Sequence, residues 1–355
     1  MPVGIDNQEN LEFLRKKMKI AVLSPVAWRT PPRKYGPWEQ IASNIAEGLI
    51  ENGIDVTLFA TADSITKGKL EYVCEYSYSE HPELDPKVCE CLHISNIMEQ
   101  ADKFDLIHNN FDFLPLTYSH LIRTPMVTTI HGFSSQKILP VYKKYNSTNT
   151  YVSISNSDRS PELDYAATVY NGINTDEFTF RSEPKDYLLF FGRIHPEKGT
   201  SESIQIAKQS GRRLIISGYI QDQEYFNGKI KPFINDNDIV YVGNSGPKER
   251  DKLLGEAYAL LHPISFEEPF GLSVVESMLC GTPVIAFNKG SMPELILDGK
   301  TGYLINTIDD AVVAVNNIRS INREYCREYA VSKFSRQKMI EGYLEVYSKV
   351  LETKS

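Results

Sequence analysis

Residues 259–286 carry the pattern that decides the fold: ALLHPISFEEPFGLSVVESMLCGTPVIA. A short apolar strand (Ala259–His262) is followed by a loop, a helix from Leu272 and a second apolar strand at 283–286. Two strands joined through a helix predict parallel pairing. Similar alternation runs through both halves of the chain, so the sequence predicts an α/β protein whose parallel sheets are covered by helices.

Length and composition narrow the class of protein. The chain has 355 residues, 41% hydrophobic and 24% charged, which fits a folded protein of two domains and excludes a largely disordered one. The net charge of −8 makes general nucleic-acid binding unexpected. No apolar run reaches the roughly 18 residues that span a bilayer, and the first residues lack a signal-peptide core. We therefore expect a cytoplasmic protein.

The alternating pattern divides the chain into two halves. The first has expected strands at 19–24, Asp55–Phe59, 105–108, Met126–Ile130, 150–154 and 168–170, and a helix at 38–52. The second has expected strands at Tyr187–Phe191, Arg213–Ser217, 239–242, Ala259–His262 and 283–286, and a terminal helix at 337–351. A polar stretch at 174–185, with turn formers and little apolar pattern, is the expected linker.

Several common motifs are absent or weak. There is no G-x-G-x-x-G after the first strand, no phosphate-binding G-x-x-x-x-G-K-[ST], no H-E-x-x-H and no G-x-S-x-G. The D-x-D at Asp236 and Asp238 is a metal candidate, but its N-D-N-D context favours a turn. Cys89 and Cys91 form a C-x-C, although five cysteines without scaffold spacing favour free thiols over a metal or redox site.

Two acids stand out in the loop and helix at 266–281. Open α/β domains bind ligands beyond the carboxyl ends of their strands, and this segment follows such a strand. Gly271 shapes the loop, and a helix that begins at Leu272 would present free backbone N–H groups to a phosphate. Glu268 and Glu276 would accept hydrogen bonds from sugar or ribose hydroxyls. By spacing alone, a loop acid and a helix-surface acid are equally supported.

Two cations follow the central strand of the second half. In 190–200 (FFGRIHPEKGT), Gly192 allows close backbone approach, and Arg193 and Lys198 then follow. Either cation alone would be interpreted as a solvated surface side chain. Because both follow the same buried strand, the sequence favours phosphate binding by the pair.

The first half contributes two weaker candidates. Gly36 in 34–39 (KYGPWE) precedes a helix and permits close backbone approach. His131 ends an apolar strand beside Gly132, where a structural role and a site role are equally supported.

Together these motifs resemble those of the retaining glycosyltransferases of family 4. The resemblance covers about residues 19–351, and its most specific element is E-x₇-E from Glu268 to Glu276. Supporting motifs are FGRIHPEKG at 191–199, YNGI at 170–173, HG at 131–132, GTPV at 281–284 and GSMPE at 290–294. The resemblance implies the GT-B fold, in which two Rossmann-like domains face each other across a cleft.

The resemblance also implies a domain plan. An N-terminal extension at 1–18 would precede an acceptor-side domain at 19–174 and a nucleotide-sugar donor-side domain at 175–334. The C-terminal helix at 335–355 would cross back to the first domain.

By resemblance, each candidate residue acquires a role. Glu276 would bind the donor ribose and Glu268 the transferred sugar, while Arg193 and Lys198 would neutralise the diphosphate. His131 would lie beside the donor sugar. The remaining donor-binding candidates act through their backbone: Gly36, Gly192, Phe270, Gly271 and Leu272.

The implied activity is hexosyl transfer with retention and without metal or other cofactor. UDP-glucose and GDP-mannose are the leading donors, and the acceptor is a hydroxyl of a sugar, glycan or lipid-linked molecule. Alternatives are another GT-B enzyme, such as a sugar-nucleotide epimerase or a phosphorylase, or a non-catalytic nucleotide-sugar binder. The complete E-x₇-E segment argues against an epimerase and the short chain against a large phosphorylase.

Some features depart from the pattern or stay open. Pro37 takes the place of a second glycine in the first loop, and Asn174 that of a common acid. The aromatic side chains of loop 27–38 would either stack on an acceptor sugar or pack the loop. Arg15, Lys16, Lys17 and Lys19 would give weak contact with an anionic membrane face, but a solvated tail is favoured.

Overall fold

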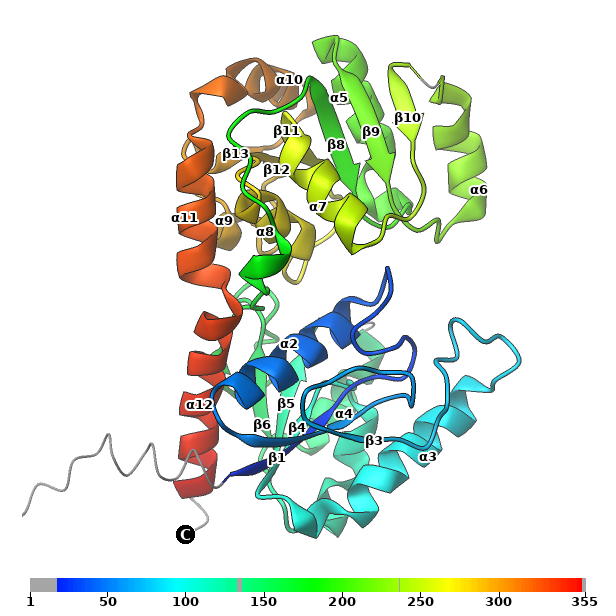
Figure 1. Cartoon of the computed structure of the whole chain (residues 1–355), viewed down its shortest axis with the longest axis vertical. Helices are drawn as coiled ribbons and strands as arrows, with labels where there is room; N and C mark the ends of the chain where they lie inside the picture. The colour runs from blue at the N-terminus through cyan, green and yellow to red at the C-terminus, as the bar shows by residue number, and fades with distance from the viewer. Residues whose placement is uncertain (1–17, 133–135, 236, 353–355) are drawn as a thin grey trace, which may run out of the picture.

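The computed structural model describes residues 18–132, 136–235 and 237–352, and it contains two parallel sheets in two lobes (Figure 1). The α/β prediction is confirmed, and so is the parallel pairing. Arg15, Lys16 and Lys17 of the basic cluster, and Asp236 of the D-x-D, lie outside the described residues.

The first sheet has seven strands in the order β3-β2-β1-β4-β5-β6-β7. Their bounds are β1 Lys19–Leu23, β2 Asp55–Phe59, β3 Lys69–Glu71, β4 Leu106–Asn109, β5 Met126–Ile130, β6 Thr150–Ser153 and β7 Tyr165–Thr168. The helices of this half are α2 Pro37–Glu51, α3 Pro86–Glu99 and α4 Leu139–Lys144. The central strands are buried throughout, which is why they are apolar runs in the sequence.

The second sheet has six strands in the order β10-β9-β8-β11-β12-β13. Their bounds are β8 Tyr187–Phe191, β9 Arg213–Ser217, β10 Ile239–Tyr241, β11 Ala259–His262, β12 Val284–Phe287 and β13 Gly302–Ile305. The helices are α5 Thr200–Ser210, α6 Gln223–Tyr225, α7 Pro247–Glu256, α8 Leu272–Leu279, α9 Met292–Leu295, α10 Ile308–Asn317, α11 Arg323–Phe334 and α12 Arg336–Glu352.

Most predicted strands are present, with ends shifted by a residue or so. The strand expected at 168–170 is observed earlier, as β7. Strands β3 and β13 were not predicted: β3 is a three-residue edge strand with exposed ends, and β13 begins with a glycine. Neither has the long apolar run that marks a central strand.

Helix α12 leaves the second lobe and packs along α2 of the first (Figure 1). The contact is close, because a Cβ placed on Gly48 would lie 2.5 Å from Ile340 Cγ1. Buried hydrogen bonds also join α12 to the first sheet. His108 Nδ1 lies 2.6 Å from Tyr347 Oη of α12, and His108 Nε2 lies 2.7 Å from Thr129 Oγ1. The last helix is therefore part of the first lobe's core.

Within the part of the chain that the structure describes, no helix is both long and apolar enough to cross a membrane. The turn interpretation of the D-x-D segment fits what is described, since Asn235 Oδ1 accepts from the backbone N–H groups of Asn237 and Asp238. All five cysteines are free thiols; Cys89 is buried and Cys91 exposed.

Candidate active site

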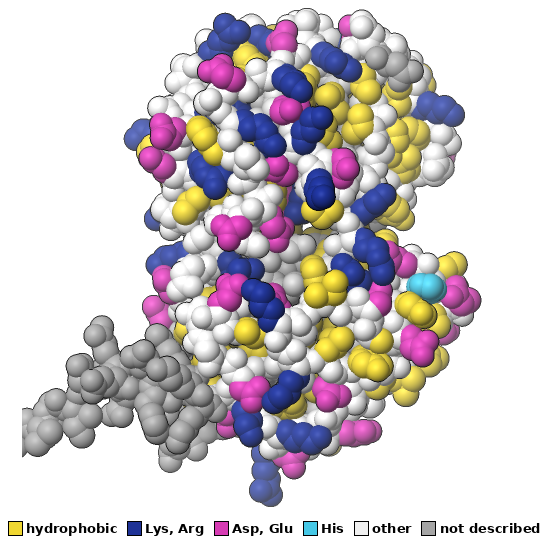
Figure 2. Space-filling view, in the orientation of Figure 1, with side chains coloured by type: hydrophobic (Ala, Val, Ile, Leu, Met, Phe, Trp, Pro, Cys, Tyr) yellow, Lys and Arg dark blue, Asp and Glu magenta, His cyan; other side chains and the backbone are white. Residues whose placement is uncertain are grey.

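A cleft of about 1020 Å³ lies between the two lobes, at the carboxyl ends of both sheets. In Figure 2 the surface narrows between the lobes, and Lys and Arg side chains lie on both sides of the waist. All ten candidate residues line the cleft: Gly36, His131, Gly192, Arg193, Lys198, Glu268, Phe270, Gly271, Leu272 and Glu276. Parallel topology brings them together, because every loop that follows a strand ends at the same edge of its sheet.

A buried ion pair joins two of the predicted residues, Lys198 and Glu268. Their side chains are only 13% and 12% exposed, and His262 Nε2 lies 3.7 Å from the same Glu268 oxygen. Burial by itself would raise the pKa of Glu268, but Lys198 and His262 outweigh it and lower this pKa to about 2. Glu268 is therefore a fixed anion at neutral pH.

Glycine makes this pairing geometrically feasible. Gly199 has φ 75°, and a Cβ there would lie 1.9 Å from the Pro263 carbonyl oxygen. Only glycine lets the turn after β8 approach the loop after β11 this closely.

Arg193 leaves the same strand end and donates a hydrogen bond to Gln221. Because Gln221 is neutral, this contact leaves the guanidinium charge uncompensated. Of the two glycines at this point, close packing requires Gly218, where a Cβ would lie 1.7 Å from the Gly192 carbonyl oxygen. A Cβ on Gly192 itself would meet only Phe190 Cζ, at 3.9 Å, so its α-carbon faces open space in the cleft.

Glu276 forms a second buried pair, this time with Arg250 of α7. Arg250 Nη1 lies 3.1 Å from Glu276 Oε1, and the side chains are 14% and 8% exposed. Burial raises the pKa of Glu276, and the charge of Arg250 opposes that rise. The alternative that Glu276 is a helix-surface acid is wrong, since α8 turns it into the cleft.

Helix α8 begins at the floor of the cleft. Its N-cap is Gly271 with φ 98°, where a Cβ would lie 2.7 Å from Met292 Cε. The helix thus starts directly beside Glu268, and its first backbone N–H groups are available to an anion.

His131 lies on the first-lobe wall and is 8% exposed. Its ring stacks on Trp38 with centroids 5.7 Å apart, and its Nε2 lies 2.9 Å from Asn110 Oδ1. Burial lowers the pKa of His131 to about 3, so the ring is neutral at physiological pH.

Three aromatic side chains bridge the two lobes at the mouth of the cleft. Tyr35 stacks on Tyr219 of the second lobe at 5.8 Å, and Trp28 packs edge-on against both at 5.9 and 6.5 Å. Of the two expectations for the first loop, packing therefore holds for Trp28 and Tyr35, and the packing extends across the cleft.

The departures in the first loop have local reasons. Gly36 has φ 148°, and a Cβ there would lie 2.8 Å from Pro32 Cβ. Pro37 is the first residue of α2, a position whose N–H has no partner within the helix, so proline is well tolerated. Asn174 caps a short turn by accepting from the Asp176 N–H.

The sequence did not single out four cleft residues, Arg250, His262, Asp112 and Tyr219, nor Asn110, which contacts His131 behind the cleft wall. His262 ends the predicted strand Ala259–His262, but nothing in the sequence marked its side chain as a neighbour of Glu268. The others belong to no motif and gain their contacts through tertiary packing. Among the described residues, no group of three or more His, Cys, Asp or Glu side chains is placed to hold a metal ion.

The architecture is that of the GT-B glycosyltransferases, and solved structures show the same fold. One is HepE of Anabaena in complex with UDP and glucose, with a TM-score of 0.72 at 20% identity, covering 93% of this chain and 99% of that one. The chain belongs to the family of glycosyl transferases group 1, whose model matches residues 173–352. The model for Glycosyltransferase Family 4 matches residues 39–177. This protein is therefore a GT-B glycosyltransferase that uses nucleotide sugars.

Two curated relatives are similar to this chain, and one of them is named a glycosyltransferase. An uncharacterized glycosyltransferase of Methanocaldococcus jannaschii, MJ1607, is 24% identical over 94% of this chain and 99% of its own length. An uncharacterized 41.2 kDa protein in the cps region of Klebsiella pneumoniae is 34% identical, but that match spans only 45% of each chain.

Proposed function

We propose that this glycosyltransferase moves a hexosyl unit, with retention, from a nucleotide diphosphate sugar to a hydroxyl of a sugar, glycan or lipid-linked acceptor. UDP-glucose and GDP-mannose are the leading donors, and the UDP and glucose bound in the HepE structure favour the first. The observation that carries the proposal is the cluster of Arg193, Lys198 and Glu268 beside the start of α8.

This cluster suits departure of a diphosphate. Breaking the sugar–phosphate bond builds negative charge on the leaving group and positive charge on the anomeric carbon. Arg193, Lys198 and the first amides of α8 stabilise the negative charge without reorganising. Since the protein supplies these positive groups, we propose that transfer proceeds without a metal ion.

Glu268 is better placed to hold the transferred sugar than to attack it. Its carboxylate is engaged by Lys198 and lies near His262, and a carboxylate held in this way accepts hydrogen bonds from sugar hydroxyls. Retention then follows if the acceptor attacks from the leaving-group face and a donor phosphate oxygen takes its proton. Neutral His131 would hydrogen-bond the donor sugar from the opposite wall.

Glu276 would receive the ribose hydroxyls, and the charge of Arg250 favours the ionised carboxylate, which is the stronger hydrogen-bond acceptor. The aromatic contact of Trp28 and Tyr35 with Tyr219 would keep the lobes closed and limit water access to the donor.

A melting-temperature panel of UDP, GDP and ADP, free and as sugar conjugates, tests the proposal. A ligand at 100 times its dissociation constant stabilises the fold by about 2.7 kcal/mol, so one base should raise the melting temperature clearly. Donor turnover should persist in excess chelator. The absence of any shift would contradict nucleotide-sugar use, and chelator-sensitive turnover would contradict the metal-free mechanism.

A further inference from the structure

We propose that the acceptor is a carbohydrate without negative charge at the residue that receives the hexosyl unit, bound in the first-lobe arm of the cleft around Tyr78, Glu90 and Asp112. The inference rests on the proposed function and names the acceptor class of the same cleft.

The arm is built by two separate segments of the first lobe. Residues 110–114 follow β4 and contribute Phe111, Asp112 and Phe113 to the cleft. The segment that leads into α3 contributes Tyr78, and α3 itself contributes Glu90. This wall is on the lobe opposite Arg193 and Lys198, so a ligand here would face the donor rather than overlap it. Aromatic surface with a few convergent polar groups is the usual composition of a small-molecule site.

Asp112 has a backbone conformation that marks it within this arm. Its φ is 88°, and among the residues that the structure describes it is the one non-glycine with positive φ. The conformation is held from both sides, because Asn109 Nδ2 donates to the Asp112 carbonyl at 2.9 Å and the Tyr142 hydroxyl donates to its carboxylate. Conformations of this kind persist where the surroundings impose them, and they cluster at ligand sites.

Glu90 supplies a second carboxylate to the same wall. The Tyr78 hydroxyl donates to Glu90 Oε1 at 3.0 Å, which orients the carboxylate. Carboxylate oxygens are strong acceptors for hydroxyl donors, and a sugar ring presents several hydroxyls. A wall that pairs oriented carboxylates with aromatic faces therefore matches a polyhydroxylated ring.

The same charges disfavour a phosphorylated acceptor. The described cleft-lining residues of the first lobe include the acids Glu39, Glu90 and Asp112 but one cation, the exposed Lys34. Burial raises the pKa of Glu39 to about 7 and that of Asp112 to about 6, so at neutral pH Glu39 carries part of a charge and Asp112 is mostly ionised. Arg33, also in the first loop, is paired with Asp63 at 2.9 Å and Glu80 at 2.8 Å. A phosphate in the arm would thus meet like charge with little compensation, and this kind of repulsion excludes unwanted partners.

The test compares neutral acceptors with their phosphates. The probes are methyl glycosides of glucose, mannose, galactose, glucosamine and N-acetylglucosamine, each with its 6-phosphate, and the readout is nucleotide release with the donor found by melting temperature. We expect kcat/KM at least tenfold higher for an uncharged or amino glycoside than for the matching phosphate. Preference for the phosphates, or equal use of both, would overturn the proposal. So would failure of every non-phosphorylated glycoside while the donor is hydrolysed.

Two variants locate the preference. Asp112→Asn and Glu90→Gln should each raise the acceptor KM about tenfold and narrow the discrimination against phosphates. Asparagine tolerates positive φ, so it keeps the backbone of residue 112. A retained nucleotide-induced melting shift shows that a variant is folded with an intact donor site. Unchanged acceptor KM and selectivity in both variants would overturn the assignment to this arm.

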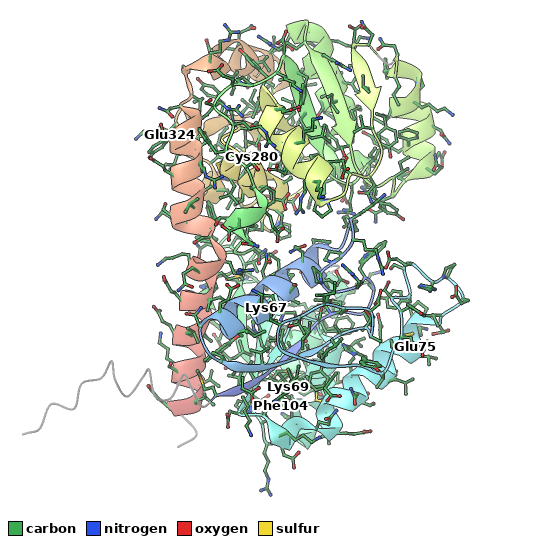
Figure 3. The ribbon with its side chains drawn as sticks, viewed as in Figure 1. Lys67, Lys69, Glu75, Phe104, Cys280 and Glu324 are labelled. Carbon is green, nitrogen blue, oxygen red and sulfur yellow. The ribbon has the colours of Figure 1, made fainter. Side chains whose placement is uncertain are left out.

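The matched control is Glu75→Gln, which removes an exposed acid of the same lobe outside the cleft (Figure 3). It should leave KM and selectivity as in the wild type, and an equal effect there would mean that only the lobe's net charge matters. If no nucleotide binds and no donor is consumed, the proposed function itself fails, and this inference fails with it.

Discussion

The two walls of the cleft differ in how their charged and neutral side chains are arranged. The second-lobe wall holds charges in buried pairs, Lys198 with Glu268 and Arg250 with Glu276. The first-lobe wall holds a neutral histidine, His131, among aromatic side chains and carboxylates. Buried charges persist only where they are paired, so the second wall cannot change one residue without stranding another. The first wall has no such ion pairs among the cleft residues described above, and it is freer to change shape.

This difference fits the division of labour that we propose. A diphosphate has the same charge whatever sugar it carries, and so it calls for fixed cations and a helix start. Acceptors differ in shape and in the positions of their hydroxyls, and we propose that the loops of the first lobe contact them. The following predictions test the contrast between a wall of paired charges and a wall without such ion pairs.

The largest effect is expected from the paired wall. Arg193→Ala together with Lys198→Ala should lower turnover about 1000-fold or more, because each fixed donor to developing charge is worth about 100-fold to 1000-fold. Turnover is measured by nucleotide release, with Lys300→Ala as a surface-charge control. Removing Lys198 leaves the buried carboxylate of Glu268 without its partner and could impair folding. The single variant Arg193→Ala avoids this problem, and its turnover should still fall about 100-fold. Near-normal turnover in both would place the diphosphate elsewhere.

The first lobe should show a pH effect instead. Burial lowers the pKa of His93 to about 4, below its ordinary value of 6.5. The stability that neutral His93 contributes is therefore complete above pH 6.5 and is lost as the pH falls towards 4.

The His93→Gln variant should be less stable than the wild type at neutral pH. This difference in unfolding free energy should shrink as the pH falls, because protonation of the buried histidine destabilises only the wild type. The variant's deficit in unfolding free energy at pH 7.5 should shrink by about 2–3 kcal/mol at pH 4.5, since one pH unit corresponds to about 1.4 kcal/mol for one group. Urea unfolding at both pH values measures it. A deficit that stays constant with pH would mean that the buried ring takes a proton as readily as an exposed one.

A smaller effect is expected at the ribose position. Glu276→Gln should weaken nucleotide binding about 10-fold to 100-fold, because hydrogen bonds to a charged group contribute about 1.5–3 kcal/mol. The dissociation constants are measured by calorimetric titration with the natural nucleotide and with its 2′-deoxy and 3′-deoxy forms. Combining the change in the protein with the change in the ligand gives a double-mutant cycle. If the carboxylate holds the ribose, variant and wild type should bind at least one deoxy form with similar affinity. An equal loss for all three ligands would assign Glu276 a purely structural role with Arg250.

Much of the second wall was predictable because its residues belong to short continuous segments. Glu268, Gly271 and Glu276 fall in one loop and helix, and Arg193 and Lys198 follow one strand. The strand ends at which these segments begin were visible as apolar runs. Their partners were not predictable: Arg250 is one of several charged residues in α7, and nothing near it in the chain marks it as the partner of Glu276.

The first wall depended far more on tertiary structure. Asp112 gained its positive φ from contacts with Asn109 and Tyr142, and Tyr219 met Tyr35 only because the lobes face each other. The short edge strand β3 was missed for a similar reason, since pairing with β2, not its own composition, makes it a strand.

The sequence by itself determined the α/β class, the parallel sheets and the ten predicted cleft residues, most of which lie in short segments of loop and helix that follow strands. These features depend on apolar periodicity and on glycine and charge at short spacing, which are local properties of the chain. Tertiary structure alone decided which charges pair, which histidines are neutral and which carboxylates form the first-lobe arm. Burial and proximity between distant segments set these properties, and neither is encoded at short range.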